Sequence, residues 1–316
     1  MIIVVGDLVT DVVAVLDGPL ATGSDTRAAV RFTGGGQAAN TAAWLASQGT
    51  PVTLVAAAGD DEAGRARVAE LASAGVHCLV RGHEHAATGT VIVLTRDGER
   101  TMITDRGANL LLSPADVDAA LAGAPTARHV HVSGYTLLDP ETRGAGLRAL
   151  AAAHERGITA SVDAASAAPL RRASAFLDWV RGVDLLLANA DEATVLAGPG
   201  DPTAQAKALA KVARVAVVKR GAGGAVWADP NVVTAPGHPV QVIDATGAGD
   251  AFAAGLLSAW LSGSSPSESL QAATALGAAA VTLLGARPSA STPPPPPPAG
   301  APPGPSFADQ GQTHVL

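Results

Sequence analysis

The sequence predicts an α/β fold built on a mainly parallel sheet. Short, uniformly apolar runs alternate with segments that begin with a helix-capping residue followed by proline. Runs without a polar face are typical of the inner strands of a parallel sheet, because helices cover both faces of such a sheet. The expected strands are 52–57, 129–133, 158–163, 184–188 and 215–219. The segments between them predict helices, so the chain winds from strand to helix to strand.

Four expected helix starts share one chemical pattern. A Ser or Asp, whose side-chain oxygen can cap a helix, precedes a proline, whose missing N–H costs nothing in the first turn. These pairs are 113–114, 139–140, 201–202 and 265–266. Glu268 lies three residues after Ser265 and completes a capping box. The second pair predicts a helix over 140–156 that ends at Gly157.

Two stretches, 11–33 and 87–105, break this alternation. Both contain alternating or β-branched runs, and the second carries an Asp97-Gly98 pair that is typical of a hairpin turn. We expect them to form a small β flap or lid outside the parallel sheet. Residues 290–316 are rich in proline and poor in core-forming residues, so they predict a polyproline-like or disordered tail after a folded domain over 1–289.

Composition excludes several classes of protein. The chain has 21 Lys and Arg against 28 Asp and Glu, a formal net charge of −7, which argues against a nucleic-acid-coating protein. Its one cysteine, Cys78, excludes a disulfide framework or a thiolate metal cluster and indicates a reducing compartment. The first residues predict a buried strand rather than an export signal, and no apolar stretch reaches the ~20 residues of a membrane-spanning helix. We therefore expect a cytoplasmic protein without nucleic-acid or membrane partners.

The segment 240–257 carries the clearest chemistry. An apolar run over 240–243, expected to be a strand, leads into the sequence Asp-Ala-Thr-Gly-Ala-Gly-Asp and then into a helix of small residues. The free N–H groups at a helix N-terminus form an anion site. Asp250 beside that site would repel a resting phosphate, but as a general base it could take the proton of a hydroxyl that attacks a phosphoryl group. The alternative is that Asp250 only caps the helix and the glycines only allow close packing.

A second segment, 33–49, supplies context for the first. Three glycines precede Gln37, Asn40 and an alanine-rich helix. Glycines let a ligand approach the backbone, and Asn40 can both donate to and accept from sugar-like hydroxyls. Without further support, the segment could also be a flexible turn that leads into a helix.

The two segments together resemble a known family. The sequences GGGQAANTAAWLASQGTPVTLVAAAGDDEAG and DATGAGDAFAAGLL are similar to the two signature regions of the ribokinase-like (PfkB) carbohydrate kinases, in that family's order. The resemblance covers nearly all of residues 1–289 and implies a three-layer αβα domain with a mainly parallel central sheet and a small β lid. It also implies ATP-dependent phosphorylation of a hydroxyl, expected to be a primary one, of a sugar or sugar-like small molecule. ATP and Mg²⁺ are then required, with K⁺ as a further expected ion.

The resemblance also assigns roles to single residues. Asp250 matches the catalytic base, and the neighbouring amides that match the anion hole belong to Gly247, Ala248 and Gly249. The positions that match contacts to substrate hydroxyls are Asp11, Gly35, Gly36 and Asn40. Those that match nucleotide contacts are Lys219, Gly221 and Gly224.

Two further groups of residues match ion sites of the family. Asn189 and Glu192 resemble its Asn-x-x-Glu motif, which acts on magnesium and phosphate partly through water. The positions that resemble its potassium loops are Asp244, Thr246, Ala280, Gly285 and Ser289. Two positions depart from ribokinases: Val9 stands where they have Asn, and Gln37 where they have Lys, so ribose itself is in doubt as the substrate.

Each assignment has a simpler structural alternative. Asp11 could merely end a strand, and Glu192 could reach back to cap a helix that begins at Asn189. Lys219 could be a strand-end lysine whose ammonium group reaches water. Arg106 follows the second lid stretch and is expected to be a solvated loop residue.

Alternatives for the whole protein also remain open at this point. They are a nucleoside kinase of the same family, a non-catalytic sugar-binding protein, and a nucleotide-dependent oxidoreductase that uses its Gly-x-Gly turn for a dinucleotide. The exposed strands of a lid would also accept a second copy, so a homodimer through the lid is expected.

Overall fold

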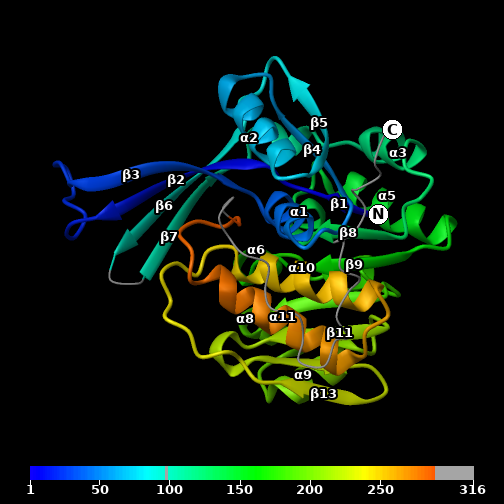
Figure 1. Cartoon of the computed structure of the whole chain (residues 1–316). Coiled ribbons are helices and arrows are strands. Elements are labelled where there is room, and N and C mark those ends of the chain that lie inside the picture. The colour runs from blue at the N-terminus through cyan, green and yellow to red at the C-terminus, as the bar shows by residue number, and fades with distance from the viewer. Residues whose placement is uncertain (97–98, 289–316) are drawn as a thin grey trace, which may run out of the picture.

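The computed structural model describes residues 1–96 and 99–288. A nine-stranded sheet forms its centre, in the order β13-β12-β11-β10-β9-β8-β1-β4-β5 (Figure 1). Its strands are β1 Ile2–Val5, β4 Val52–Gly59, β5 His77–His83, β8 His129–Ser133, β9 Thr159–Asp163, β10 Leu185–Asn189, β11 Val215–Lys219, β12 Ala225–Ala228 and β13 Val232–Ala235. Neighbours from β11 to β5 pair in parallel, and β12 and β13 add two antiparallel pairings at one edge. The five expected strands are all present, which confirms the predicted winding.

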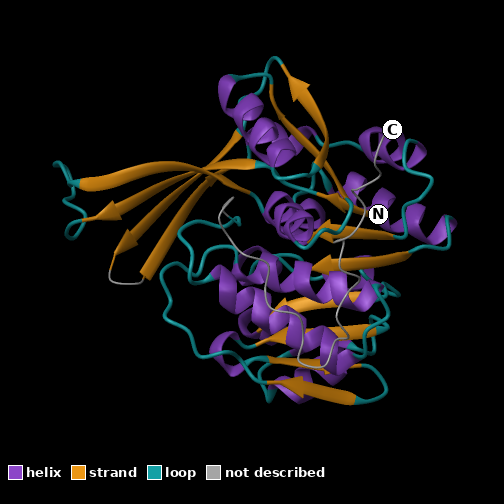
Figure 2. Cartoon of the chain, in the orientation of Figure 1, coloured by secondary structure: helices purple, strands orange, loops and turns teal. Residues whose placement is uncertain are grey.

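Helices cover both faces of this sheet (Figure 2). One face packs against α1 Gln37–Ser47, α2 Glu62–Ser73, α10 Ala248–Leu261 and α11 Pro266–Ala280. The other packs against α3 Pro114–Ala122, α4 Gly134–Leu138, α5 Arg143–Glu155, α6 Ala167–Leu170, α7 Phe176–Trp179, α8 Ala190–Ala197 and α9 Pro202–Leu209. Successive strand side chains point to opposite faces, so Ile3 and Val5 join one apolar cluster while Ile2 and Val4 join the other. The expected three-layer αβα architecture is confirmed.

A smaller sheet of four strands lies beside the large one and projects away from it in Figure 1. In the order β3-β2-β6-β7, its strands are Ala28–Gly35, Val9–Leu16, Gly89–Arg96 and Glu99–Asp105. Strand β2 follows β1 after three residues, and β3 ends at the residue before Gly36, which precedes α1. The small sheet is therefore joined to the body next to the glycines of the 33–49 segment. The Asp97-Gly98 pair and the proline-rich 290–316 lie outside the described residues.

Three of the four expected helix starts are confirmed by their caps. Ser113 and Ser265 each form a capping box, and Asp201 accepts hydrogen bonds from two amides of the first turn of α9. The helix predicted from residue 140 is wrong in its start. Asp139 instead follows the short helix α4, and α5 begins at Arg143. The Asp139 carboxylate accepts a hydrogen bond from Arg106 at 2.8 Å, so its oxygen serves a tertiary contact rather than a cap.

The strand predicted over 240–243 is also absent. Residues 236–243 run as irregular chain, and the side chains of Val240, Val242 and Ile243 are 41%, 62% and 61% exposed. An apolar run predicts a strand only where a sheet edge is available to pair with it. Here the segment instead passes beside a cavity that Val240 and Val242 help to line.

No helix of the described residues combines the length and the apolar character needed to cross a membrane. The apolar helix α11 packs against the central sheet and α10.

Candidate active site

Polar side chains gather where the parallel strands end. Asp163 is the last residue of β9, Asn189 the last of β10 and Lys219 the last of β11. The N-terminus of α10, which carries Asp250, faces the same edge. In open parallel sheets, ligands bind outside the carboxyl ends of the strands. The topology thus brings together residues that lie far apart in the sequence.

A cavity of about 500 Å³ opens at this edge. Eight of the residues predicted for the site line it: Asn189, Glu192, Lys219, Gly221, Gly224, Ala248, Gly249 and Asp250. Its opposite wall is apolar and comes from the 240–245 segment, α10 and α11, with Val242, Phe252 and Val281 among its members. A cavity with a charged end and an apolar end suits a ligand that joins phosphates to a flat, weakly polar ring.

Asp250 lies at the charged end of the cavity, in the first turn of α10. Burial is the main cause that raises the pKa of its carboxyl, to about 7. A hydrogen bond from Asn40 Nδ2, 2.9 Å from Asp250 Oδ2, opposes that rise, while the charge of Asp163 adds to it. A carboxylate whose pKa lies near neutrality is suited to accept a proton at physiological pH.

The backbone before Asp250 is shaped by Gly247. This residue has φ of +75° and precedes the first turn of α10, whose leading N–H groups have no carbonyl partners within the helix. A Cβ at Gly247 would lie 2.3 Å from the carbonyl oxygen of Ala286, so only glycine fits there. The Lys219 ammonium lies near Gly249, where a Cβ would be 3.4 Å from Nζ. Helix dipole and ammonium together make this corner favourable for negative charge.

Asp163 links two of the polar side chains and was not identified from the sequence. Its two oxygens bind the Lys219 ammonium at 2.5 Å and the Gln37 amide nitrogen at 3.1 Å. Burial alone would lower the pKa of Lys219, but Asp163 and Glu192 outweigh it and raise that pKa above the ordinary value. Lys219 is thus a buried, paired cation and not a strand-end lysine that reaches water. The one available signal was that Asp163 ends a predicted strand, as most ligand-binding residues of such sheets do.

Glu192 and Asn189 form a capping box at the start of α8. Glu192 accepts from the backbone N–H and the side-chain amide of Asn189, and the Asn189 oxygen accepts from the Glu192 N–H. Burial raises the pKa of Glu192 to about 7, against the opposing charge of Lys219. The structural alternative for this pair is therefore real, and both residues nevertheless line the cavity. With Asp163 they offer the oxygen donors that a hydrated magnesium ion prefers.

The residues of the expected potassium loops are partly brought together. One Asp244 oxygen accepts from the N–H and hydroxyl of Thr246, and the other accepts from the N–H of Gly285. Ala280 is the buried last residue of α11. Ser289 lies outside the described residues. Asp244 thus ties the loop before α10 to the loop after α11.

The residues expected to hold substrate lie on the other side of Asp250, at the base of the small sheet. Asp11 is in β2, Gly35 ends β3, and the Asp11 carboxyl lies so close to Gly35 that a Cβ there would be 2.3 Å from it. Burial is the main cause that raises the pKa of Asp11 to about 6. Gly36 has φ of +100° and Asn40 is buried in α1. Asn40 is the one of this group that reaches Asp250 directly.

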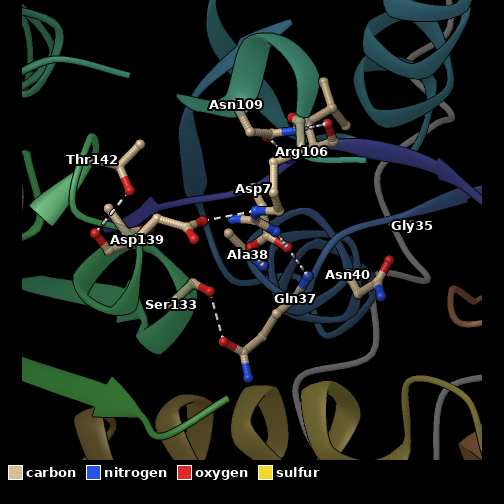
Figure 3. Close-up of polar contacts among 12 residues, drawn as sticks. Asp7, Gly35, Gln37, Ala38, Asn40, Arg106, Asn109, Ser133, Asp139 and Thr142 are labelled. Carbon is tan, nitrogen blue, oxygen red and sulfur yellow. Dashed lines mark hydrogen bonds and ion pairs between the residues drawn. The ribbon is translucent and has the colours of Figure 1, made fainter. Parts of the chain in front are cut away.

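The expectation that Arg106 is a solvated loop residue is wrong. Its side chain is 17% exposed, donates to Asp139 at 2.8 Å and lies 3.7 Å from an Asp7 oxygen (Figure 3). It also stacks over the ring of Tyr135. It is therefore a half-buried, paired cation and not a solvated loop residue. Asp7 also accepts from the backbone N–H groups of Gln37 and Ala38, so it occupies the N-terminus of α1. Nothing in the local sequence of Arg106 indicated these long-range partners.

Several known proteins are similar to this chain. The chain is 32% identical to the ATP-dependent ribose-1-phosphate kinase of Halopiger xanaduensis, over 85% of this chain and 87% of that one. It is also 32% identical to the 2-dehydro-3-deoxygluconokinase of Thermoproteus tenax, over 75% and 76% of the two chains. The crystal structure of adenosine kinase from Sinorhizobium meliloti superposes with a TM-score of 0.83 at 26% identity, over 91% and 95% of the two chains.

The family model agrees with these relatives. The model described as pfkB family carbohydrate kinase matches residues 1–293. This match spans both signature segments and the whole described structure, and it leaves the oxidoreductase alternative without support. The chain belongs to the pfkB family of carbohydrate kinases, as its two signature segments predict.

Proposed function

We propose that this protein transfers the γ-phosphoryl group of ATP to a hydroxyl, a primary one, of a sugar or sugar-like small molecule. The observation that carries the proposal is the position of Asp250. This carboxyl, with a pKa raised to about 7, lies between the cavity and the residues at the base of the small sheet. A proton acceptor is thus placed where an acceptor hydroxyl and a nucleotide phosphate would meet. The ATP-dependent relative at 32% identity supports ATP as the donor.

The transfer would run as an in-line displacement. The substrate hydroxyl oxygen forms a bond to the γ-phosphorus, the bond from that phosphorus to the β,γ-bridging oxygen breaks, and ADP leaves with the bond's electron pair. Asp250 takes the hydroxyl proton. The N–H groups of Gly247, Ala248 and Gly249 lie at the positive end of α10 and would stabilise the charge on the transferred oxygens. Substrate would be held by Asp11, Gly35, Gly36 and Asn40.

The cavity suits the nucleotide. Phosphates would lie at its charged end, near Lys219, Gly221 and Gly224, and the adenine against the apolar wall. Asn189, Glu192 and Asp163 are the donors that would hold Mg²⁺, which supplies neutralisation of phosphate charge when bound. Asp244, Thr246, Ala280, Gly285 and Ser289 would hold K⁺ near the anion hole. We propose that the enzyme is cytoplasmic, because a chain with a single cysteine has no disulfide framework and fits a reducing compartment.

We propose a kinase domain of residues 1–289 in which the small sheet forms a lid over the substrate. The small sheet is also the proposed dimer interface. An apolar row crosses its four strands, with Phe32 paired to Val12, Val12 to Ile92 and Ile92 to Ile103. Phe32, Ile92 and Ile103 are 71%, 39% and 54% exposed. Side chains alternate along β2, so Asp11 belongs to the opposite face. A second copy would cover the row while Asp11 faces the substrate.

A nucleoside kinase is the second candidate. The structural match to an adenosine kinase, at a TM-score of 0.83, favours it. The family model and the sugar kinases at 32% identity favour a sugar. Sugars and nucleosides both carry hydroxyls that Asp11 and Asn40 could bind.

Asp250→Asn should lower kcat at least ~10³-fold, because the amide cannot accept the hydroxyl proton. Substrate binding should be retained, since the change is isosteric. Steady-state ADP release and calorimetric titration of the substrate would measure the two effects. Asp229→Asn, an acid of the β12–β13 turn outside the cavity, serves as the control. Undiminished turnover in Asp250→Asn would refute the base.

In a profile of kcat/KM against pH, the fall on the acidic side (the acidic limb) should have its midpoint near pH 7. The base works only when unprotonated, so its raised pKa of about 7 makes activity fall about tenfold per unit below that pH. Glu192 also has a pKa of about 7, so the profile of Glu192→Gln separates the two groups. The limb should remain in that variant. The assignment of Asp250 as the base would be contradicted if the limb disappeared in Glu192→Gln, or if kcat/KM stayed constant down to pH 5.

Free sugars and sugar derivatives should be phosphorylated faster than nucleosides. A panel of both, assayed for ADP release with ATP and Mg²⁺ and with K⁺ present or replaced by Na⁺, measures this directly. Product analysis by ³¹P NMR would identify the acceptor hydroxyl. Turnover of a nucleoside above that of every sugar would move the assignment to the second candidate.

The wild-type protein should have the mass of a dimer in light scattering, and Phe32→Lys that of a monomer. The charge would be buried in the apolar row of the interface, where it has no partner. Leu20→Lys provides a matched control, because Leu20 is 59% exposed but lies in the loop between β2 and β3. A monomeric wild type would refute the interface.

A further inference from the structure

Arg287 lies in the loop after α11, close to the site but outside both signature segments. Its side chain is 8% exposed. The loop is held in place by Trp44 of α1, whose indole N–H donates to the carbonyl of Ala286 at 2.9 Å. The same carbonyl packs against Gly247. Arg287 is therefore fixed beside the N-terminus of α10 by contacts of its neighbour in the chain.

The guanidinium group of Arg287 joins three parts of the site. Its Nε donates to Asn40 Oδ1 at 3.0 Å, and its Nη2 donates to the carbonyl of Gly35 at 2.8 Å. Its Nη1 lies 3.5 Å from an oxygen of Glu70 in α2. The guanidinium group thus contacts Gly35 at the end of β3, the Asn40 amide in α1 and the Glu70 carboxylate in α2.

The contact with Asn40 decides which way its amide points. The oxygen of that amide accepts from Arg287, so the nitrogen turns toward Asp250 and donates to Oδ2 at 2.9 Å. The flipped amide would place an N–H donor against the guanidinium and a carbonyl oxygen against the carboxylate. Both contacts would be repulsive in a buried site. A fixed cation therefore selects one of the two amide orientations.

We propose that Arg287 is a positioning residue, which acts through Asn40 to hold a hydrogen-bond donor on the carboxylate of Asp250. The proposal rests on the proposed role of Asp250 as the base. It deepens that role, because it names the group that keeps the base oriented toward the hydroxyl. Through Gly35 the same cation also ties the base to the end of lid strand β3.

Other charged or titratable groups around Asp250 remain in place when Arg287 is changed. They are Asp163 from β9, Lys219 from β11, Asp7 after β1 and Tyr135 from α4. Asp163 binds Lys219 and Gln37, and Asp7 binds the α1 amides and lies beside Arg106. Arg287 also lowers the raised pKa of Asp11, so a changed pH profile reports either on the Asn40 amide or on Asp11, and the double-mutant cycle below separates the two.

Arg287→Met should lower kcat about tenfold to a hundredfold, the range expected for a lost charge-assisted hydrogen bond. The acidic limb of kcat/KM should move to higher pH, since an amide free to flip no longer favours the charged carboxylate. Arg287→Lys keeps the charge near Glu70 but lacks the planar fork, so it should show the same shift. If Arg287→Met does not fold, Arg287→Lys provides the same test. Glu70→Gln, which leaves the Nε and Nη2 contacts intact, should keep kcat within about twofold.

The decisive measurement is a double-mutant cycle between positions 40 and 287. If Arg287 acts through Asn40, then Arg287→Met should cost little further kcat in an Asn40→Ala background and should no longer move the acidic limb. Effects that add in the double variant would overturn the proposal, as would an unshifted limb in both single Arg287 variants. An active Asp250→Asn variant would instead refute the base itself, so the two failures are distinguishable.

Discussion

A buried carboxylate at the positive end of a helix is the constraint on which this site depends. Asp250 is held in low-dielectric surroundings, where its charge is costly, next to backbone N–H groups that favour charge. Burial raises its pKa to about 7, and the hydrogen bond from Asn40 opposes that rise. The position requires Gly247 at a positive φ and the packing of the 284–287 loop against that glycine. Distant loops thus determine the chemistry of one side chain.

Three cations around the site are each held in an ion pair. Lys219 is bound by Asp163, Arg106 by Asp139 and Asp7, and Arg287 by Glu70. Each pair joins two elements that are far apart in the chain. Buried pairs of this kind contribute little net stability, but removing one partner leaves an uncompensated charge. Their arrangement is better explained by the geometry they impose on the cavity and on the base of the lid.

The family assignment and the geometry support different parts of the interpretation. The match over residues 1–293 places the chain among the pfkB carbohydrate kinases, and the relatives named as kinases of a sugar phosphate, a sugar acid and a nucleoside show how varied the acceptors of similar proteins are. The cavity beside α10 is an independent observation from the structure. The chain departs from ribokinases at Val9 and Gln37, near the proposed substrate residue Asp11, so the acceptor stays open within the family.

The sequence by itself determined the α/β winding, three of the four helix caps and the segment around Asp250, because these depend on residues within a few positions of one another. It misplaced the start of α5 and expected a strand over 240–243, because Asp139 and the apolar run are used by partners distant in sequence. Asp163 and Arg287 were missed for the same reason. A local pattern encodes the conformation of a segment, whereas the pairing of buried charges is decided only when the sheet and its covering helices bring those segments together.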